Sequence, residues 1–204
     1  MVEQVDGLVQ RKMRRTRDRI AQTAMTLFLA RGYEQVSVAE IATAAEVAEK
    51  TVYNHFPAKA QLVFDEDPDV LTEILDAVRD RAPGQSALDA LRDYLPDRGG
   101  RLGQRRPGND RAAFRAMVLA SPALREHQRV MAARYETALA QLLAEDTGAP
   151  PDAPEPFIAA AALIGALRAG FDTGPAAGGT APAITRALDL LAGGLGDYAR
   201  KAGP

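Results

Sequence analysis

Residues 37–57 read SVAEIATAAEVAEKTVYNHFP, and they contain the most informative structural signals in the chain. It predicts two short helices, over 38–45 and 49–55, that are separated by a break at 46–48. Neither helix is long enough to be stable alone in water, so a third helix has to bury them. Two short helices joined by a tight turn and packed on a third form a helix-turn-helix unit.

Local signals mark the ends of the two short helices. Ser37 and Glu40 form a capping box, in which the Ser hydroxyl accepts from an early main-chain N–H and the Glu carboxylate reaches back. Phe56 ends the second helix, because a residue before proline avoids helical dihedral angles. Pro57 suits the first turn of a following helix that carries Lys59 and Leu62.

A longer helix is predicted over about 13–31, and Gly32 is typical of the left-handed residue that follows a helix. The inward face of this helix repeats at helical spacing and consists of Ile20, Ala24, Leu27 and Phe28. This helix supplies the surface that buries the two short helices.

The rest of the chain is also predicted to be helical, because alternating strand patterns are nearly absent. Asp65-Glu66-Asp67-Pro68 marks a boundary between a first domain at 1–65, which contains the helix-turn-helix unit, and a helical body at 66–204. We expect an all-α fold of about nine to ten helices. The helices of the body are expected at about 68–82, 86–96, 109–120, 122–147, 155–173 and 180–201, with a loop over 96–108.

Charge is unevenly distributed along the chain. The formal net charge of −2 argues by itself against nucleic-acid binding, but six Arg and Lys residues lie within residues 11–19. Such a basic arm is what a phosphate backbone attracts, although a solvated tail has the same composition. A second group of arginines lies in the predicted loop at 97–108, where contact with DNA is an alternative to simple solvation.

Composition and motifs argue against an enzyme. The chain has no cysteine, which excludes disulfides, thiolate nucleophiles, zinc fingers and iron–sulfur clusters. His55 and His127 lie in different predicted domains, and the sequence has no nucleophile elbow, phosphate-binding loop or zinc-protease motif. We expect no catalytic residue, no metal site and no cofactor.

The chain is expected to be cytoplasmic and not associated with a membrane. Its first residues carry charges and lack the apolar segment of a secretory signal. The longest apolar stretch, residues 157–167, is too short to span a bilayer.

The segment from about residue 16 to 62 resembles the TetR family of bacterial repressors. The run from Thr51 to Lys59, TVYNHFPAK, at its offset from Ile41-Ala42 is close to a fingerprint of that family. The other matching residues are Ile20, Ala24, Leu27, Phe28, Gly32, Tyr33, Val38, Ala45, Val47 and Leu62. Glu46 departs from the glycine usual in the turn, and a left-handed dihedral angle there would cost Glu roughly 1 kcal/mol relative to Gly.

The second short helix is expected to enter the major groove of DNA, while the first crosses the backbone. Lys50, Thr51 and Asn54 can present donors and a methyl group to base edges, and Glu49 can accept from a cytosine amino group. The predicted DNA-binding residues are Arg14, Arg17, Ser37, Val38, Glu49, Lys50, Thr51, Tyr53, Asn54, His55 and Lys59.

Other residues of this set suit phosphate. Tyr53 and His55 each carry a donor, and Ser37 and Lys59 stand at helix starts, where main-chain N–H groups favour anions. For three residues a role other than DNA binding remains open. Tyr53 and Phe56 could each be a core aromatic residue, and His55 could be an ordinary surface histidine.

The last two helices are expected to form a dimer seam, because two helix-turn-helix domains on a palindromic site require a two-fold dimer. Small residues recur at helical spacing in 157–171, and again beside leucines in 184–198. Ordinary packing within one chain is the alternative explanation of this pattern.

A ligand pocket is expected between the helices of the body, lined by apolar groups with a few polar ones. The sequence of 122–144 resembles a subgroup of the family that senses acyl-CoA-like compounds. The predicted ligand-binding residues are Phe114, Arg115, Met117, Val118, His127, Met131, Arg134, Tyr135, Leu163, Leu167, Arg168 and Phe171.

The resemblance therefore implies a repressor that binds palindromic operator DNA as a homodimer and is released by a small-molecule effector. A DNA-binding regulator that has no effector, whether an activator or constitutive, is the alternative. Release would require the effector to bind more tightly to a conformation of the dimer in which the spacing of the two DNA-binding domains does not fit the operator.

Overall fold

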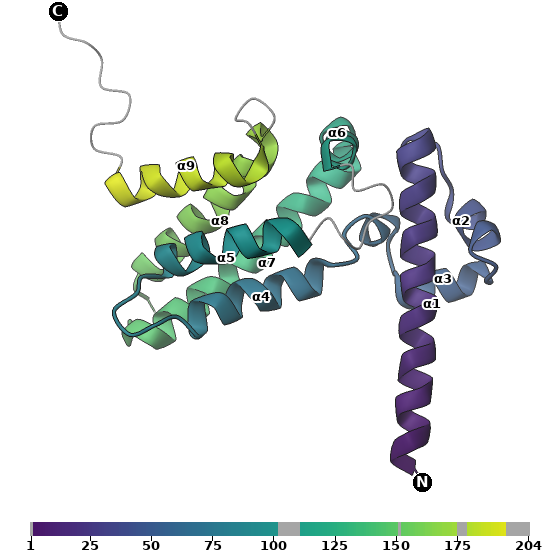
Figure 1. Cartoon of the computed structure of the whole chain (residues 1–204), viewed down its shortest axis with the longest axis horizontal. Coiled ribbons are helices and arrows are strands. Elements are labelled where there is room, and N and C mark those ends of the chain that lie inside the picture. The colour runs from purple at the N-terminus through teal and green to yellow at the C-terminus, as the bar shows by residue number, and fades with distance from the viewer. Residues whose placement is uncertain (1, 102–110, 151, 175–178, 195–204) are drawn as a thin grey trace, which may run out of the picture. The chain divides into compact units, whose positions relative to one another are not determined.

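The computed structural model describes residues 2–101, 111–150, 152–174 and 179–194, and all regular elements within them are helical (Figure 1). The predicted all-α fold is thereby confirmed. The helices are α1 (Val2–Arg31), α2 (Val38–Ala44), α3 (Glu49–His55), the short 3-10 helix η1 (Lys59–Leu62), α4 (Asp67–Arg79), α5 (Ala87–Arg101), α6 (Arg111–Ala120), α7 (Pro122–Thr147), α8 (Glu155–Thr173) and α9 (Thr180–Gly193).

The chain forms two compact units. The first unit contains α1, α2, α3 and η1 together with α6 and the first residues of α7, up to His127. The second unit contains α4, α5, the remainder of α7, α8 and α9. Segments that are distant in the sequence thus belong to one unit.

The core of the first unit contains three of the four residues of the predicted stripe on α1, and the fourth, Leu27, is only partly buried. Ile20, Ala24 and Phe28 are almost wholly buried there, and Ile41 of α2 and Val52 of α3 are buried as well. Burial of a side chain the size of Ile or Phe contributes about 1.5–3 kcal/mol. The two seven-residue helices are therefore held by this core rather than by their own helical stability.

The turn between α2 and α3 is strained at one residue. Glu46 has a φ of 53°, the left-handed value that glycine adopts readily and glutamate does not. The N–H of Val47 donates to the carbonyl of Ala42 at 3.0 Å, so the turn closes tightly on the end of α2. The chain thus adopts a left-handed turn at this position without the glycine that is usual in the family it resembles.

Several predicted boundaries are wrong. The first helix begins at Val2 rather than near Met13. Once the buried part of a helix has formed, each further residue adds one main-chain hydrogen bond, so the helix can extend into solvent through polar residues. The helix predicted to end at Pro96 continues through it to Arg101. The segment after Pro57 forms a 3-10 turn. The rest of the predicted loop at 102–108 and the predicted helix end at 195–201 lie outside the described residues.

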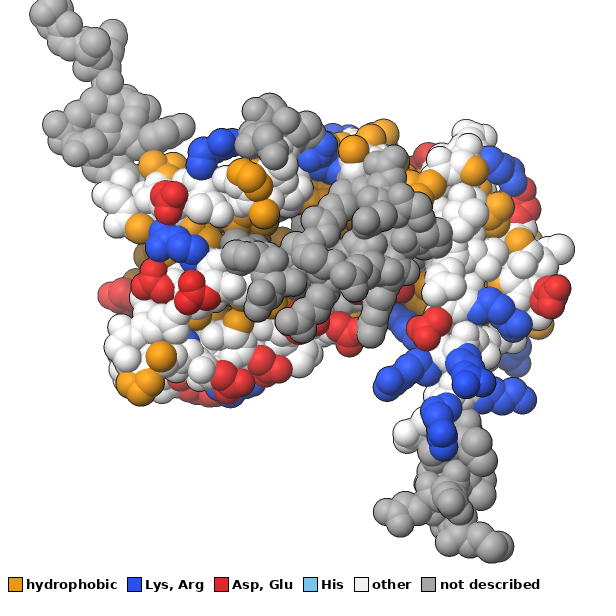
Figure 2. Space-filling view, viewed as in Figure 1, with side chains coloured by type: hydrophobic (Ala, Val, Ile, Leu, Met, Phe, Trp, Pro, Cys, Tyr) orange, Lys and Arg blue, Asp and Glu red, His pale blue; other side chains and the backbone are white. Residues whose placement is uncertain are grey.

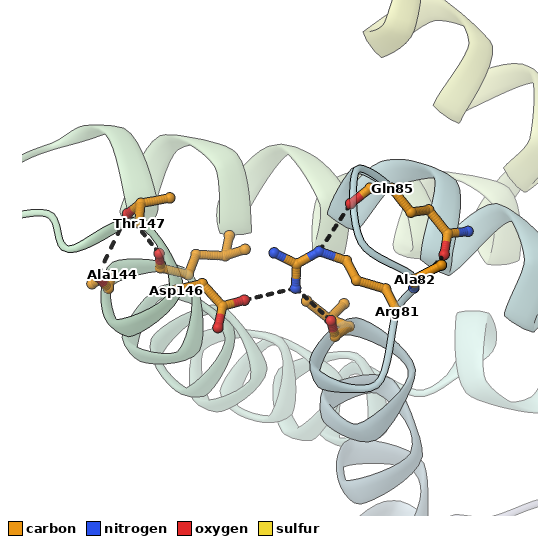
Figure 3. Close-up of polar contacts among 8 residues, drawn as sticks. Arg81, Ala82, Gln85, Ala144, Asp146 and Thr147 are labelled. Atoms are coloured by element: carbon orange, nitrogen blue, oxygen red, sulfur yellow. Dashed lines mark hydrogen bonds and ion pairs between the residues drawn. The ribbon is translucent and has the colours of Figure 1, made fainter.

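The second unit is tied together by Arg81, which follows α4. Its Nη1 donates to Asp146 Oδ2 of α7 at 2.6 Å and to the carbonyl of Val78 (Figure 3). Its Nε donates to the carbonyl of Gln85 at 3.1 Å. The planar guanidinium thereby joins the end of α4, the turn before α5 and the end of α7.

Helices α8 and α9 approach each other closely where Gly170 lies against Ile184. A Cβ at Gly170 would lie 2.7 Å from the main-chain nitrogen of Ile184, so only glycine fits. Helix α8 is 19 residues long and apolar enough, by length and composition, to cross a membrane, which the shorter run at 157–167 did not indicate. One such helix is weak evidence, and Leu163 and Ile164 of α8 belong to the core of this unit.

The strained turn leads to a first prediction. Replacing Glu46 with Gly is expected to raise the free energy of unfolding of the first unit by about 1 kcal/mol, because glycine adopts the positive φ without a Cβ clash. Urea denaturation of the full chain, followed by circular dichroism, measures the change. Glu46→Ala is the matched control, since it removes the same charge and keeps the clash. An equal gain in both variants would assign the effect to charge and contradict the prediction.

Candidate nucleic-acid interface

Helix α3 presents a polar face to solvent and an apolar face to the core. Val52 is 1% exposed, whereas Glu49, Lys50 and Asn54 are exposed and Thr51 is partly exposed. The helix thus offers donors and acceptors along one side and is fixed along the other. This is the geometry that base edges in a major groove require.

The two aromatic residues of this segment differ in their surroundings. Tyr53 is 46% exposed, so it is not the core residue that one alternative made it. Phe56 is 1% exposed and belongs to the core. His55 is partly exposed, and its ring lies 6.5 Å from that of Phe56. Of these three residues, Tyr53 and His55 can turn a donor outward.

The capping box at the start of α2 forms as predicted. The N–H of Glu40 donates to Ser37 Oγ at 3.2 Å, and the N–H of Ser37 donates to Glu40 Oε2 at 2.8 Å. That main-chain donor, the Ser37 hydroxyl and the nearby Arg31 guanidinium lower the pKa of Glu40 to about 2. Val38 is buried, so only its main chain can face a ligand.

Lys59 lies against the core rather than extending into solvent. Its Nζ donates to the carbonyl of Tyr33 at 2.6 Å and lies 4.2 Å from the centre of that ring and 5.7 Å from the ring of Phe28. Burial lowers the pKa of the Lys59 ammonium, and burial raises the pKa of Tyr33 to about 12. One of the three ammonium donors is therefore used inside the unit.

The basic arm is part of α1. Arg11, Lys12, Arg14, Arg15 and Arg19 are exposed on this helix. Figure 2 shows Lys and Arg side chains gathered along the described part of α1 that is nearest the N-terminus. The arm is a helical extension with a positive surface, which suits a phosphate backbone.

Arg17 differs from the other arginines of the arm. Its guanidinium donates to two main-chain carbonyls, of His55 and Asp65, and lies over the ring of Phe56. These partners were not predicted from the sequence. The signal was present in the spacing, because residue 17 lies three and seven positions before the buried Ile20 and Ala24 and so shares their face of the helix.

Helices α6 and α7 add contacts to the first unit that the sequence did not indicate. Ser121, which is buried between these helices, donates to Glu34 Oε1 at 2.6 Å. The ring of Phe64 stacks on His127 at 5.4 Å and meets Phe114 edge-on at 6.3 Å. Two predicted ligand-binding residues thus lie around one aromatic ring that follows η1.

The other predicted ligand-binding residues are spread over both units. Arg115, Met117 and Val118 lie on α6 in the first unit. In the second unit Tyr135 and Leu163 belong to the core, with Met131 and Leu167 packed against it. The remaining three lie on the same two helices, where Arg134 and Arg168 are exposed and Phe171 is partly exposed.

A hollow of about 420 Å³ in the second unit lies elsewhere, between α4 and α5. It is open and half of its lining residues are charged, and none of the predicted ligand-binding residues lines it. Its lining consists of Glu73, Asp76, Ala77, Asp80, Arg81, Ala82, Gln85, Ala90, Asp93 and Tyr94.

Two family models match the chain. The model of bacterial regulatory proteins of the TetR family matches residues 20–65, which hold α2 and α3. The model of the MftR C-terminal domain, a TetR-type C-terminal domain, matches residues 87–196. The second match alone covers more than half of the chain.

The HTH-type transcriptional regulator TcmR of Streptomyces glaucescens is 40% identical over 85 residues. The match covers 42% of this chain but only 38% of the length of TcmR.

Solved structures share the fold at low identity. The SmeT–triclosan complex has a TM-score of 0.58 and 19% identity, covering 93% of this chain and 96% of that one. The FadR repressor of Thermus thermophilus in complex with lauroyl-CoA has a TM-score of 0.54 and 23% identity, covering 92% and 98%.

The two family models match both the helix-turn-helix and most of the helices that follow it, and both models describe TetR-type proteins. The chain belongs to the TetR family of bacterial regulatory proteins.

Proposed function

We propose that this chain is a cytoplasmic transcriptional repressor that binds palindromic operator DNA as a homodimer and is released by a small-molecule effector. The observation that carries the proposal is the polar face of α3, which is exposed over a buried Val52 beside a basic α1. We assign DNA binding to residues 1–65, and effector binding and dimerisation to residues 66–204.

The proposed contacts with bases come from Glu49, Lys50, Thr51 and Asn54. Contacts with phosphate come from Tyr53, His55 and the exposed arginines of α1, of which Arg14 is one. Ser37 and Val38 lie at the start of α2, where the hydroxyl of Ser37 is already bonded to Glu40. Lys59 would add a phosphate contact only with the ammonium donors that Tyr33 leaves unused.

The proposed dimer seam is supported by apolar side chains on the outside of α8. Phe157 and Ile158 are 57% and 66% exposed, although large apolar side chains are usually buried. On α9, Leu190 is also exposed. Residues 195–198 of the predicted seam lie outside the described residues.

The proposed effector is a small molecule with an apolar part, with acyl-CoA-like molecules as the first class to test. Two proteins of the same fold, SmeT and FadR, were solved with triclosan and with lauroyl-CoA. Of the predicted ligand-binding residues in the second unit, Leu163 and Phe171 are apolar and Arg134 and Arg168 are cationic, which suits an apolar chain with an anionic end.

Variants of α3 test the DNA-binding proposal. A duplex is first selected from a random library with the full chain. Lys50→Ala is expected to weaken binding to this duplex roughly 10- to 100-fold, because one bidentate base contact contributes about 1–3 kcal/mol. Tyr53→Phe is expected to weaken it less, because it removes only one hydrogen bond to phosphate. Arg129→Ala, which removes one positive charge from the exposed side of α7, is the control. Unchanged affinity in both α3 variants would contradict the proposed interface.

Light scattering tests the seam. The wild-type chain at micromolar concentration is expected to have twice the 21.8 kDa mass of one chain. Ile158→Glu is expected to shift it toward the monomer, since a carboxylate at the seam would be buried without a partner. Val130→Glu on α7 is the matched control, because Val130 is 61% exposed and lies outside the seam. A monomeric wild type would contradict the seam.

Thermal unfolding with and without lauroyl-CoA tests the effector. A ligand that binds only the folded chain contributes about 2.7 kcal/mol at one hundred times its Kd, so Tm is expected to rise by several degrees. Lauroyl-CoA should also release the selected duplex, whereas CoA alone, the control, should do neither. A wider series of metabolites that leaves both Tm and duplex binding unchanged would favour the effector-free alternative.

A further inference from the structure

Arg17 joins two main-chain segments of the first unit. Its Nη1 donates to the carbonyl of His55 at 2.8 Å, and its Nη2 donates to the carbonyl of Asp65 at 3.1 Å. The guanidinium carbon lies 4.2 Å from the centre of the Phe56 ring. The side chain thus bridges the last residue of α3 and a residue shortly before α4.

The chemistry of these partners suits a guanidinium. The last carbonyls of a helix have no partner within the helix and carry the negative end of its dipole, so a cation there is favourable. A planar fork can donate to two carbonyls at once while its face covers an aromatic ring. A lysine ammonium at this place could not keep all three contacts.

The position of α3 depends on few contacts. The helix has seven residues, and Val52 is its one buried side chain. A helix of this length does not hold its own shape or direction in water. A contact at its C-terminal carbonyl therefore restricts how it tilts, and base contacts tolerate displacements of only about 0.5 Å.

We propose that Arg17 is a positioning residue for DNA recognition, which holds α3 at the angle that base contacts require and does not itself bind phosphate. The proposal rests on the proposed DNA-binding function. It replaces the direct DNA contact that the sequence predicted for Arg17, because its Nη1 and Nη2 both donate within the unit. Specificity, rather than general attraction to DNA, is the property that Arg17 controls.

The test compares two duplexes of equal length, one selected from a random library with the wild-type full chain and one of random sequence. Affinity for each is measured from 50 to 400 mM KCl. Arg17→Gln is expected to lower affinity for the selected duplex at least tenfold. Affinity for the random duplex should stay within twofold, and the slope of log K against log salt should not change. A purely structural loss would lower both affinities by the same factor.

Arg14→Gln is the matched control, because Arg14 lies one helical turn away and is exposed. It is expected to weaken both duplexes equally and to lower the magnitude of the salt slope by about 0.9 for each phosphate that the variant no longer neutralises. If Arg17→Gln behaves in the same way as Arg14→Gln, Arg17 is an ordinary phosphate-binding residue and the proposal is overturned.

Arg17→Lys separates charge from geometry. The variant keeps the positive charge and cannot bridge both carbonyls, so the ratio of selected to random affinity is expected to fall at least threefold. Full wild-type behaviour of Arg17→Lys overturns the proposal. This variant also decides the question if Arg17→Gln does not fold.

Hydrogen exchange tests the local effect without DNA. Amides of residues 53–56 are expected to exchange faster in Arg17→Lys than in the wild type, while amides of residues 24–28 in α1 stay protected. If the wild type selects no duplex, the DNA-binding proposal fails, and this exchange experiment still tests the position of α3. Unchanged exchange at residues 53–56 overturns the present inference alone.

Discussion

Burial of two short helices against one long helix holds the first unit together. Helices α2 and α3 have seven residues each, too few to be stable in isolation. The stripe of α1 that includes Ile20 and Phe28 removes their apolar sides from water. The same burial leaves the other side of α3 uncovered. Because α3 is stable only when its apolar side is packed on the core, it is held along that side and exposes its polar side to solvent.

Signals that act within a few residues were sufficient to predict much of this arrangement. The capping box at Ser37 and the proline after Phe56 set the ends of α2 and α3, because both act through adjacent main-chain groups. Predictions were wrong or missing where the structure depends on contacts between residues that are distant in the sequence. Helix α5 continues through Pro96, and the partners of Arg17 lie 38 and 48 residues away.

The predicted ligand-binding residues illustrate the same limit. Tyr135 and Leu163, which were predicted to line a pocket, belong to the core of the second unit, and an inward face is equally typical of a core and of a pocket. The hollow between α4 and α5 is lined by charged groups such as Asp76 and Asp93 that a search for apolar stripes would not select. Whether packed helices leave a space between them depends on their separation and on side-chain volumes. The spacing of residues in the sequence predicts neither of these quantities.

The capping box has a consequence for acid tolerance. In the unfolded chain the Glu40 carboxyl would titrate near its ordinary pKa of 4.5, whereas in the folded chain it titrates near 2. Its contribution to stability is therefore fully present above pH 4.5 and is lost only as the pH falls toward 2. A fall of one or two pH units from neutrality therefore leaves this cap ionised, and the start of α2 stays in place.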